Sequence, residues 1–273
     1  MNTRCKQPTT TARMSVVVGL GVLFMLGTLS SAVAQNTRLN DYNTIAWLTN
    51  TTTLRFSDRW SGHLEYQFRR DDFLRNGQQN LFRTGINFQP NKAVTLRVGY
   101  AYIETFPYGD IPIQAAGRLF PEHRIYQMAQ LNNPIGRLEV SHRFMLEQRW
   151  FGRFLNAESP RPDETVFVNR FRYMARLQWP LRRVEPTEPT PYVAAYDEVL
   201  IGFGRNVNEN VFDQNRLALL VGYRFSPAFR VEGGFFQQLL QLPREIQNRN
   251  VFQYNNGLIV NTVVTLDLRR KAE

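Results

Sequence analysis

Glutamates and arginines recur at alternate positions along two neighbouring stretches of the chain, and they are the residues best suited to chemistry. Glu147 and Arg149 lie in the first stretch, and Arg170, Arg172 and Arg176 lie in the second. A hairpin between the stretches would place Glu147 beside Arg170 or Arg172, where carboxylate and guanidinium groups form strong ion pairs. Such a cluster can attract an anionic solute. The more common use of such pairs is structural, to fill a narrow space and fix the register of the strands.

The three histidines raise the question of catalysis. His142 follows Ser141 directly, but adjacent residues of a strand face opposite sides, so this pair cannot share a hydrogen bond. His63 shares a polar face with Glu65, and His123 lies at the start of a strand pattern. The sequence contains neither a glycine-rich phosphate loop nor a histidine cluster with the spacing of metal ligands. We therefore predict no catalytic residue, no metal and no cofactor, and keep a lipid-modifying barrel enzyme as an alternative.

Residues 1–34 have the three-part layout of a secretory signal peptide. A basic segment precedes the uncharged stretch Ser15–Leu29, and Ala32-Val33-Ala34 offers small residues for cleavage. The apolar stretch is too short for a membrane-spanning helix. Cleavage leaves a single domain, residues 35–273, and removes the only cysteine, Cys5. Disulfides and thiolate chemistry are thereby excluded from the mature chain.

The positive charge of the chain does not indicate a nucleic-acid partner. The formal net charge is +10, and removal of three leader cations reduces it to +7. The basic residues are spread over alternate positions of predicted strands, whereas a phosphate-binding surface gathers them in one patch. We expect no nucleic acid among the partners.

A repeat of period two runs from Tyr42 to Arg269 and defines the elements that position these charges. In the stretch Leu138–Trp150, even positions are mostly apolar and odd positions are mostly polar or charged. Successive strand side chains point to opposite faces, so each such stretch predicts a strand with one apolar face and one charged face. Eleven such segments occur, at residues 44–56, 60–70, 79–89, 93–105, 122–132, 137–151, 165–180, 191–204, 214–225, 229–240 and 251–268.

The lengths of the segments and of their connections favour a transmembrane antiparallel β-barrel. Most segments exceed the five or six residues typical of globular strands and suffice for a tilted membrane strand. Short turns alternate with longer loops, as in bacterial outer-membrane barrels with periplasmic turns and outer loops. With eleven strands, the first and last would run in the same direction. An antiparallel seam needs an even number, so we expect about twelve, with residues Thr37–Thr44 as a possible extra strand.

The apolar faces could contact either lipid or a protein core. A soluble secreted β-sandwich that binds a ligand would bury them, and it remains an alternative. Lipid is favoured because aromatic residues gather near strand ends, as in the interfacial girdles of membrane barrels. The predicted girdle comprises Trp60, Phe88, Tyr102, Trp150, Trp179, Tyr192, Phe225 and Phe229.

The charged faces would then line the lumen of the barrel. The predicted polar network of the lumen comprises Arg97, Glu139, Arg143, Glu147, Arg149, Arg170, Arg172, Arg176, Glu198 and Arg216. An arginine-rich lumen indicates a narrow, porin-like pore that prefers anions. The loop 106–121 has two readings, a flexible outer loop as the default or a plug folded into the lumen.

Several short motifs distributed along the chain resemble a known family. They are Pro121–Arg124, Arg143–Trp150, Asn169–Leu177, Glu198 and Asp213–Tyr223. Together they resemble a bacterial outer-membrane β-barrel family described only as a domain of unknown function. The resemblance implies a signal peptide and an outer-membrane barrel, and it transfers no catalytic residues.

These observations together place the mature chain in the outer membrane of a Gram-negative bacterium. The expected partners are outer-membrane lipid and, during biogenesis, the barrel-assembly machinery. The sequence does not specify an oligomeric state or a permeating solute.

Overall fold

The computed structural model describes residues 38–182, 188–207 and 210–269, which form a closed barrel of eleven strands. The predicted signal peptide, residues 1–34, lies outside the described residues. A single turn of 3-10 helix, η1 (Asp72–Leu74), interrupts the strands. The strands are β1 (Arg38–Arg55), β2 (Trp60–Asp71), β3 (Asn76–Asn91), β4 (Val94–Thr105), β5 (Phe120–Ile135), β6 (Leu138–Arg153), β7 (Glu164–Pro180), β8 (Thr190–Phe203), β9 (Phe212–Ser226), β10 (Phe229–Ile246) and β11 (Arg249–Asp267).

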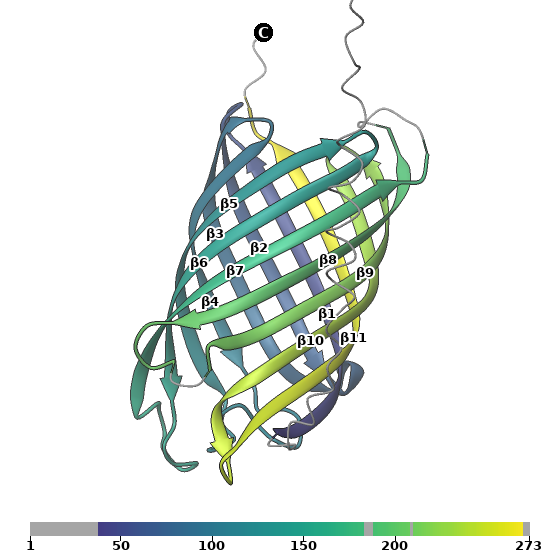
Figure 1. Ribbon diagram of the computed structural model, residues 1–273. Helices are drawn as coiled ribbons and strands as arrows, with labels where there is room; N and C mark the ends of the chain where they lie inside the picture. The colour runs from purple at the N-terminus through teal and green to yellow at the C-terminus, as the bar shows by residue number, and fades with distance from the viewer. Residues whose placement is uncertain (1–37, 183–187, 208–209, 270–273) are drawn as a thin grey trace, which may run out of the picture. The chain divides into compact units, whose positions relative to one another are not determined.

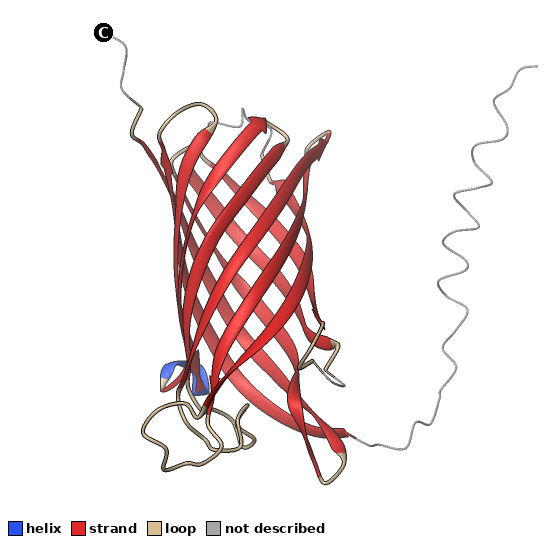
Figure 2. Ribbon diagram, turned by 90° about the vertical axis from the view of Figure 1, so that its left-hand side faces the viewer, coloured by secondary structure: helices blue, strands red, loops and turns tan. Residues whose placement is uncertain are grey.

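Strands adjacent in sequence pair antiparallel all the way round the barrel (Figure 1). One end, which we name the short-turn end, carries the connections 56–59, 92–93, 136–137 and 227–228. The opposite long-loop end carries η1 and the loops 106–119 and 154–163, which gather there in Figure 2. The predicted alternation of short turns and longer loops is therefore present.

The closure of the barrel differs from our expectation of twelve strands. β1 and β11 both run from the long-loop end to the short-turn end and pair in parallel, from Arg38↔Asn250 to Arg55↔Asp267. Parallel pairing satisfies the backbone of both strands, so an odd number closes without an open edge. Residues 38–44, the described part of the suggested extra strand, are the first part of β1. At this seam a Cβ on Gly257 would lie 1.7 Å from the Ile45 carbonyl oxygen, so only glycine fits.

The eleven predicted segments correspond one to one with the observed strands. The two largest differences in their bounds are six residues each: β1 begins at Arg38 rather than residue 44, and β10 continues beyond the predicted Leu240 to Ile246. The expected long loop at 241–250 is therefore a tight hairpin. Its two turn residues, Gln247 and Asn248, have φ values of 52° and 58°, which suits the twist of paired strands.

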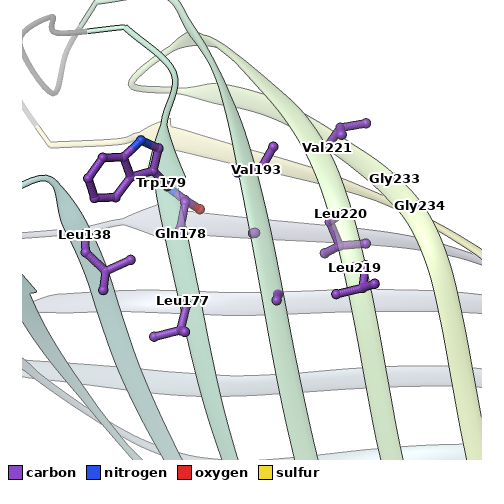
Figure 3. A pocket seen from close by; sticks show the side chains of 12 residues that line it. Leu138, Leu177, Gln178, Trp179, Val193, Leu219, Leu220, Val221, Gly233 and Gly234 are labelled. Carbon is purple, nitrogen blue, oxygen red and sulfur yellow. The ribbon is translucent and has the colours of Figure 1, made fainter.

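The outer face of the barrel is apolar around its whole circumference. Every strand exposes at least one large apolar side chain on this face: Leu48, Leu64, Phe82, Leu96, Ile125, Phe144, Leu177, Val193, Leu219, Phe235 and Leu258. Between β6 and β10 these residues line an outward-facing groove of about 470 Å³, with Trp179 at one side (Figure 3). The sheet is a single layer, and no described segment covers this face. The sandwich fold of the alternative is therefore wrong, because the strands form one closed sheet.

One wall of the interior is also apolar, a feature that the sequence analysis did not predict. Trp47, Leu220, Phe236 and Ile259 are buried together on the inner side of β1 and β9–β11. This cluster lies beside charged inner residues of the same strands, such as Arg216 on β9 and Glu232 on β10. Leu219 and Leu220 illustrate the alternation, because the first is 54% exposed and the second 3%.

Candidate functional site

The predicted lumen residues lie on the inner wall, and most of them belong to one continuous set of ion pairs. We name this set the ion-pair network. Its members are Glu122, Arg124, Arg143, Glu147, Arg149, Arg170, Arg172, Glu198, Asp213 and Arg216. They come from β5–β9, whose antiparallel register brings these positions to similar heights in the barrel.

Glu147 is the centre of the network and is fully buried. The Arg170 Nε group donates a 2.7 Å hydrogen bond to Glu147 Oε2, and Arg172 Nη1 donates a 2.9 Å bond to Oε1. Arg170 also donates to Asp213 at 2.6 Å, and Arg172 donates to Glu198 at 2.8 Å. The hairpin pairing expected from the sequence is thus present, with Glu147 beside both arginines.

The part of the network nearest the long-loop end is closely compensated. Arg124 donates two bonds to Glu122, at 2.7 and 2.8 Å, and Arg149 donates to the same carboxylate at 2.5 and 3.2 Å. Arg149 also lies 3.8 Å from Asp213. These pairs place buried side chains in this part of the bore, including Glu122, Arg124 and Arg170.

The loop 106–119 folds onto the inner wall at the long-loop end and adds a second closure. Tyr108 is buried, donates a 2.8 Å bond to Gln253 and accepts one from Asn255 at 3.2 Å. Burial raises the pKa of this phenol to about 12. Arg244 donates to the carbonyl oxygens of Pro112 and Ile113. These contacts agree with the second interpretation of this loop, in which it folds into the lumen as a plug.

On the side of the short-turn end, the network borders a cavity of about 820 Å³, which we name the vestibule; four members of the network, Arg143, Arg172, Glu198 and Arg216, form part of its wall. It reaches the short-turn end, since Lys92, Ala93 and Pro134 lie in its wall, and its inner end lies at Trp47 and Arg69. Of the predicted lumen residues, the vestibule is lined by Arg97, Glu139, Arg143, Arg172, Arg176, Glu198 and Arg216.

The charges that line the vestibule do not balance. Nine cationic side chains face it, against four carboxylates. Glu198 alone forms ion pairs with three arginines, Arg143, Arg172 and Arg216. Even when Arg172 is assigned to Glu147, four positive charges remain in excess. Buried cationic side chains without carboxylate partners create a positive potential, and this potential favours anions in the vestibule.

The other vestibule arginines have mixed partners. Arg83 pairs with Glu65 at 2.8 Å, and Glu65 also accepts a bond from His63 at 3.2 Å. Arg176 donates to Glu232 at 2.6 Å, and Arg97 donates to the Asn87 amide oxygen at 2.5 Å. Arg97 thus has no carboxylate partner among the described residues. Glu139 accepts a 2.7 Å bond from Gln178.

Seven of the eight predicted girdle aromatics lie on the outer face, and Tyr192 does not. Tyr192 is 2% exposed and donates a 2.9 Å bond to Glu232 inside the barrel. Its ring lies across the wall at Gly222, where a Cβ would be 2.3 Å from the ring. The assignment was wrong for a local reason: Tyr192 and Glu198 are six residues apart on β8, and equal parity places both on the same face.

Sequence analysis missed several inward residues that complete the site. These are Trp47, Arg69, Arg83, Glu122, Arg124, Asp213 and Arg230. Asp213 is three residues from Arg216, so strict alternation would have placed it on the outer face. A register shift between β8 and β9 at this point, where Leu200 pairs with Gln214 and Ile201 with Phe212, breaks the alternation, and both Asp213 and Gln214 are buried. The pairing of the missed residues across the barrel had no signal in a single sequence.

The histidine and serine of the alternative enzyme hypothesis lie on opposite faces. Ser141 lines the vestibule, whereas His142 lies outside and its Nδ1 is 2.9 Å from the Tyr173 hydroxyl. No cluster of three or more potential metal ligands occurs in the part of the chain that the structure describes. Within the same residues, no helix is long and apolar enough to cross a membrane.

Comparison with known proteins identifies the family. Residues 44–249 match the family model described as "Protein of unknown function (DUF2490)". The chain belongs to this family. Membership agrees with the resemblance seen in the short motifs, and it assigns no activity. No curated protein matches the chain.

A solved structure also matches, a rhombohedral crystal form of the NanC porin. The two sequences are 10% identical, the match covers 73% of this chain and 83% of the porin chain, and the TM-score is 0.39.

Proposed function

We propose that this protein is an outer-membrane β-barrel with a narrow, anion-preferring lumen that is open at the short-turn end and closed towards the long-loop end. The short-turn end would face the periplasm, as the short turns of bacterial barrels do. The observation that carries this proposal is the excess of cationic side chains in the vestibule wall.

The outer face supports the membrane part of the proposal. All eleven strands expose large apolar side chains to the outside of a single-layer barrel. In water, each such side chain would forgo about 1.5–3 kcal/mol of burial free energy, which hydrocarbon supplies. A closed barrel also leaves no unpaired backbone edge in lipid. Outer-membrane lipid is accordingly the proposed partner, with barrel-assembly machinery acting during insertion.

The inner face supports the anion preference. Arginine guanidinium groups remain charged at any physiological pH, so the field of the vestibule is permanent. Within low-dielectric walls, a positive field raises the local concentration of anions and lowers that of cations. The network around Glu147 and the plug at Tyr108 occupy the remaining bore, so conduction requires these contacts to open.

The proposal is tested by single-channel recording in planar bilayers under a salt gradient. The full mature chain is expected to give small, infrequent currents with a reversal potential of anionic sign. A variant in which a short glycine-serine linker replaces residues 107–118 is expected to open more often, because the plug is removed. No current above the bare-membrane level from either protein would retire the pore.

Selectivity and location have separate readouts. Arg230→Gln, which removes one vestibule cation, is expected to reduce anion preference, while Arg59→Gln at the exposed short turn leaves it unchanged. Cation preference in the unmodified protein would overturn the anion assignment. Recovery of the protein in a soluble fraction without detergent would reject the membrane barrel.

A further inference from the structure

The inner end of the vestibule contains an unusual arrangement of two arginines on one indole. The guanidinium carbon of Arg69 lies 3.8 Å from the ring centroid of Trp47, and that of Arg216 lies 5.3 Å from it. All three side chains are buried and line the vestibule. The Trp47 Nε1 group donates a 2.6 Å bond to Gln78, which fixes the ring. The ring therefore holds two cations at a defined position.

Arg69 has no carboxylate partner among the described residues. Its Nε donates a 2.8 Å bond to the Gln67 amide oxygen, Nη2 donates to the same oxygen, and Nη1 donates to Gln79. Its side chain is only 4% exposed. Neutral amide oxygens orient a guanidinium but do not neutralise it, so Arg69 is a buried cation with uncompensated charge.

Arg216 is only weakly compensated. Its Nε and Nη2 groups donate to the Gln214 amide oxygen at 3.1 and 2.7 Å. Its contact with Glu198 is long, at 3.4 Å, and that carboxylate also receives shorter bonds from Arg143 and Arg172. Arg216 thus shares a single negative charge with two better-placed arginines.

The unused donors of these two arginines define the chemistry of a ligand. A guanidinium carries five N–H groups. Arg69 and Arg216 each direct three of them to acceptors among the described residues, which leaves two N–H groups on each. A planar guanidinium matches the paired oxygens of a carboxylate, sulfate or phosphate better than a spherical halide.

We propose that the Trp47, Arg69 and Arg216 cluster is a binding site for a small oxyanion that enters from the short-turn end. The inference rests on the vestibule of the proposed function and adds a specific binding site at its inner end. Arg97 and Arg143 line the route from the opening, and the 820 Å³ vestibule is within the size range of small-ligand sites. The shared chemistry is a pair of anionic oxygens, whether on a carboxylate or on an inorganic oxyanion.

Trp47 can report on its own site. The chain has four tryptophans, and the other three, Trp60, Trp150 and Trp179, lie on the outer face. A variant with these three changed to phenylalanine leaves Trp47 as the only indole. The folded variant in detergent is titrated with sodium sulfate, sodium phosphate or a small dicarboxylate, with chloride holding the ionic strength constant. A saturable change in Trp47 fluorescence is expected with at least one oxyanion.

Substitutions in the same background locate the site. Arg69→Gln is expected to weaken oxyanion binding at least tenfold. Arg69→Lys is expected to weaken it less, because lysine keeps the positive charge but lacks the paired N–H groups of the guanidinium. Arg59→Gln, far away at the short-turn end, should leave the affinity within twofold. Heat-modified migration on gels verifies folding of each variant, and Arg216→Gln replaces Arg69→Gln if the latter does not fold.

The outcomes separate this inference from the proposed pore. Saturable binding without any channel current would support the oxyanion site and reject the proposed pore. The opposite result is an anion-selective current with a Trp47 fluorescence change that is strictly linear in the concentration of all three oxyanions. It would support the pore and overturn the oxyanion site. Equal affinity in Arg69→Gln and the parent would also overturn it. Whether carboxylate or sulfate and phosphate bind more tightly identifies the source of the ligand oxygens.

Discussion

The two halves of the lumen use the same residue type in opposite ways. Towards the long-loop end, Arg124, Arg149 and Arg170 each contact buried carboxylates at short distances. In the wall of the vestibule, Arg69 and Arg97 donate hydrogen bonds to amide oxygens and pair with no carboxylate among the described residues. The first half is filled and nearly balanced in charge, and the second is hollow and cationic.

This difference shows that an arginine-rich face does not by itself define a functional site. A buried ion pair satisfies its own charges and fills space, so it contributes rigidity and register rather than ligand binding. A buried guanidinium without a carboxylate has donors left for a ligand. Carboxylate placement, rather than the number of arginines, distinguishes the structural half from the candidate binding half.

The strongest test of the comparison removes the central carboxylate of the compensated half. Glu147→Gln leaves Arg170 and Arg172 with a neutral partner in a buried site, and we expect a loss of about 3–5 kcal/mol in the free energy of unfolding. The measurement is urea unfolding of the folded barrel in vesicles, followed by tryptophan fluorescence. The matched change Glu139→Gln, on an exposed vestibule carboxylate, should cost less than about 1 kcal/mol. Equal losses would mean that the two halves do not differ.

A second test compares the inner and outer faces at adjacent positions of β1. Leu48 is 44% exposed on the outer face, whereas Thr49 lines the vestibule. Leu48→Arg would place a charge in hydrocarbon and should destabilise the barrel by about 2–4 kcal/mol. Thr49→Arg has aqueous space available and should assemble normally. Assembly is measured as the fraction of heat-modifiable folded protein in membranes, and similar fractions for both variants would contradict the lipid-facing assignment.

The smallest expected effect concerns the loop 154–163 at the long-loop end. The Leu155 N–H donates to Asp163 at 2.8 Å and the Ser159 hydroxyl donates at 2.9 Å, and these bonds lower the pKa of Asp163 below its usual 3.8. Because the folded pKa is depressed, the stabilisation of the loop is present above pH 3.8 and is lost as the pH falls through the folded value.

That loop effect is measured from the NMR shift of the Leu155 amide as the pH is lowered. Asp163→Asn should abolish the pH dependence of this amide shift while the barrel remains folded. An unchanged titration in Asp163→Asn would show that another group orders the loop.

The period of the hydrophobic pattern determined much of this protein. It specified eleven strands and which side chains of each strand share a face, since side chains alternate strictly along an extended chain. The one misplaced girdle residue, Tyr192, follows that rule, because it shares the inner face with Glu198; its assignment to the girdle did not apply the rule. The pairing of Glu147 with Arg170 was also accessible, because neighbouring strands in a hairpin have local register.

Only the tertiary structure decided how the ring closes and where the charges meet. The count of eleven strands already implied that β1 and β11 run in the same direction, but their direct parallel pairing joins residues about 212 positions apart and has no signal local to either strand. Trp47 lies directly opposite Arg69 in the register of β1 and β2, but its contact with Arg216 on β9 crosses the bore. A strand pattern determines the face on which a side chain lies. The distance between faces, and therefore which arginines are neutralised and which remain available, depends on the circumference and tilt of the closed barrel.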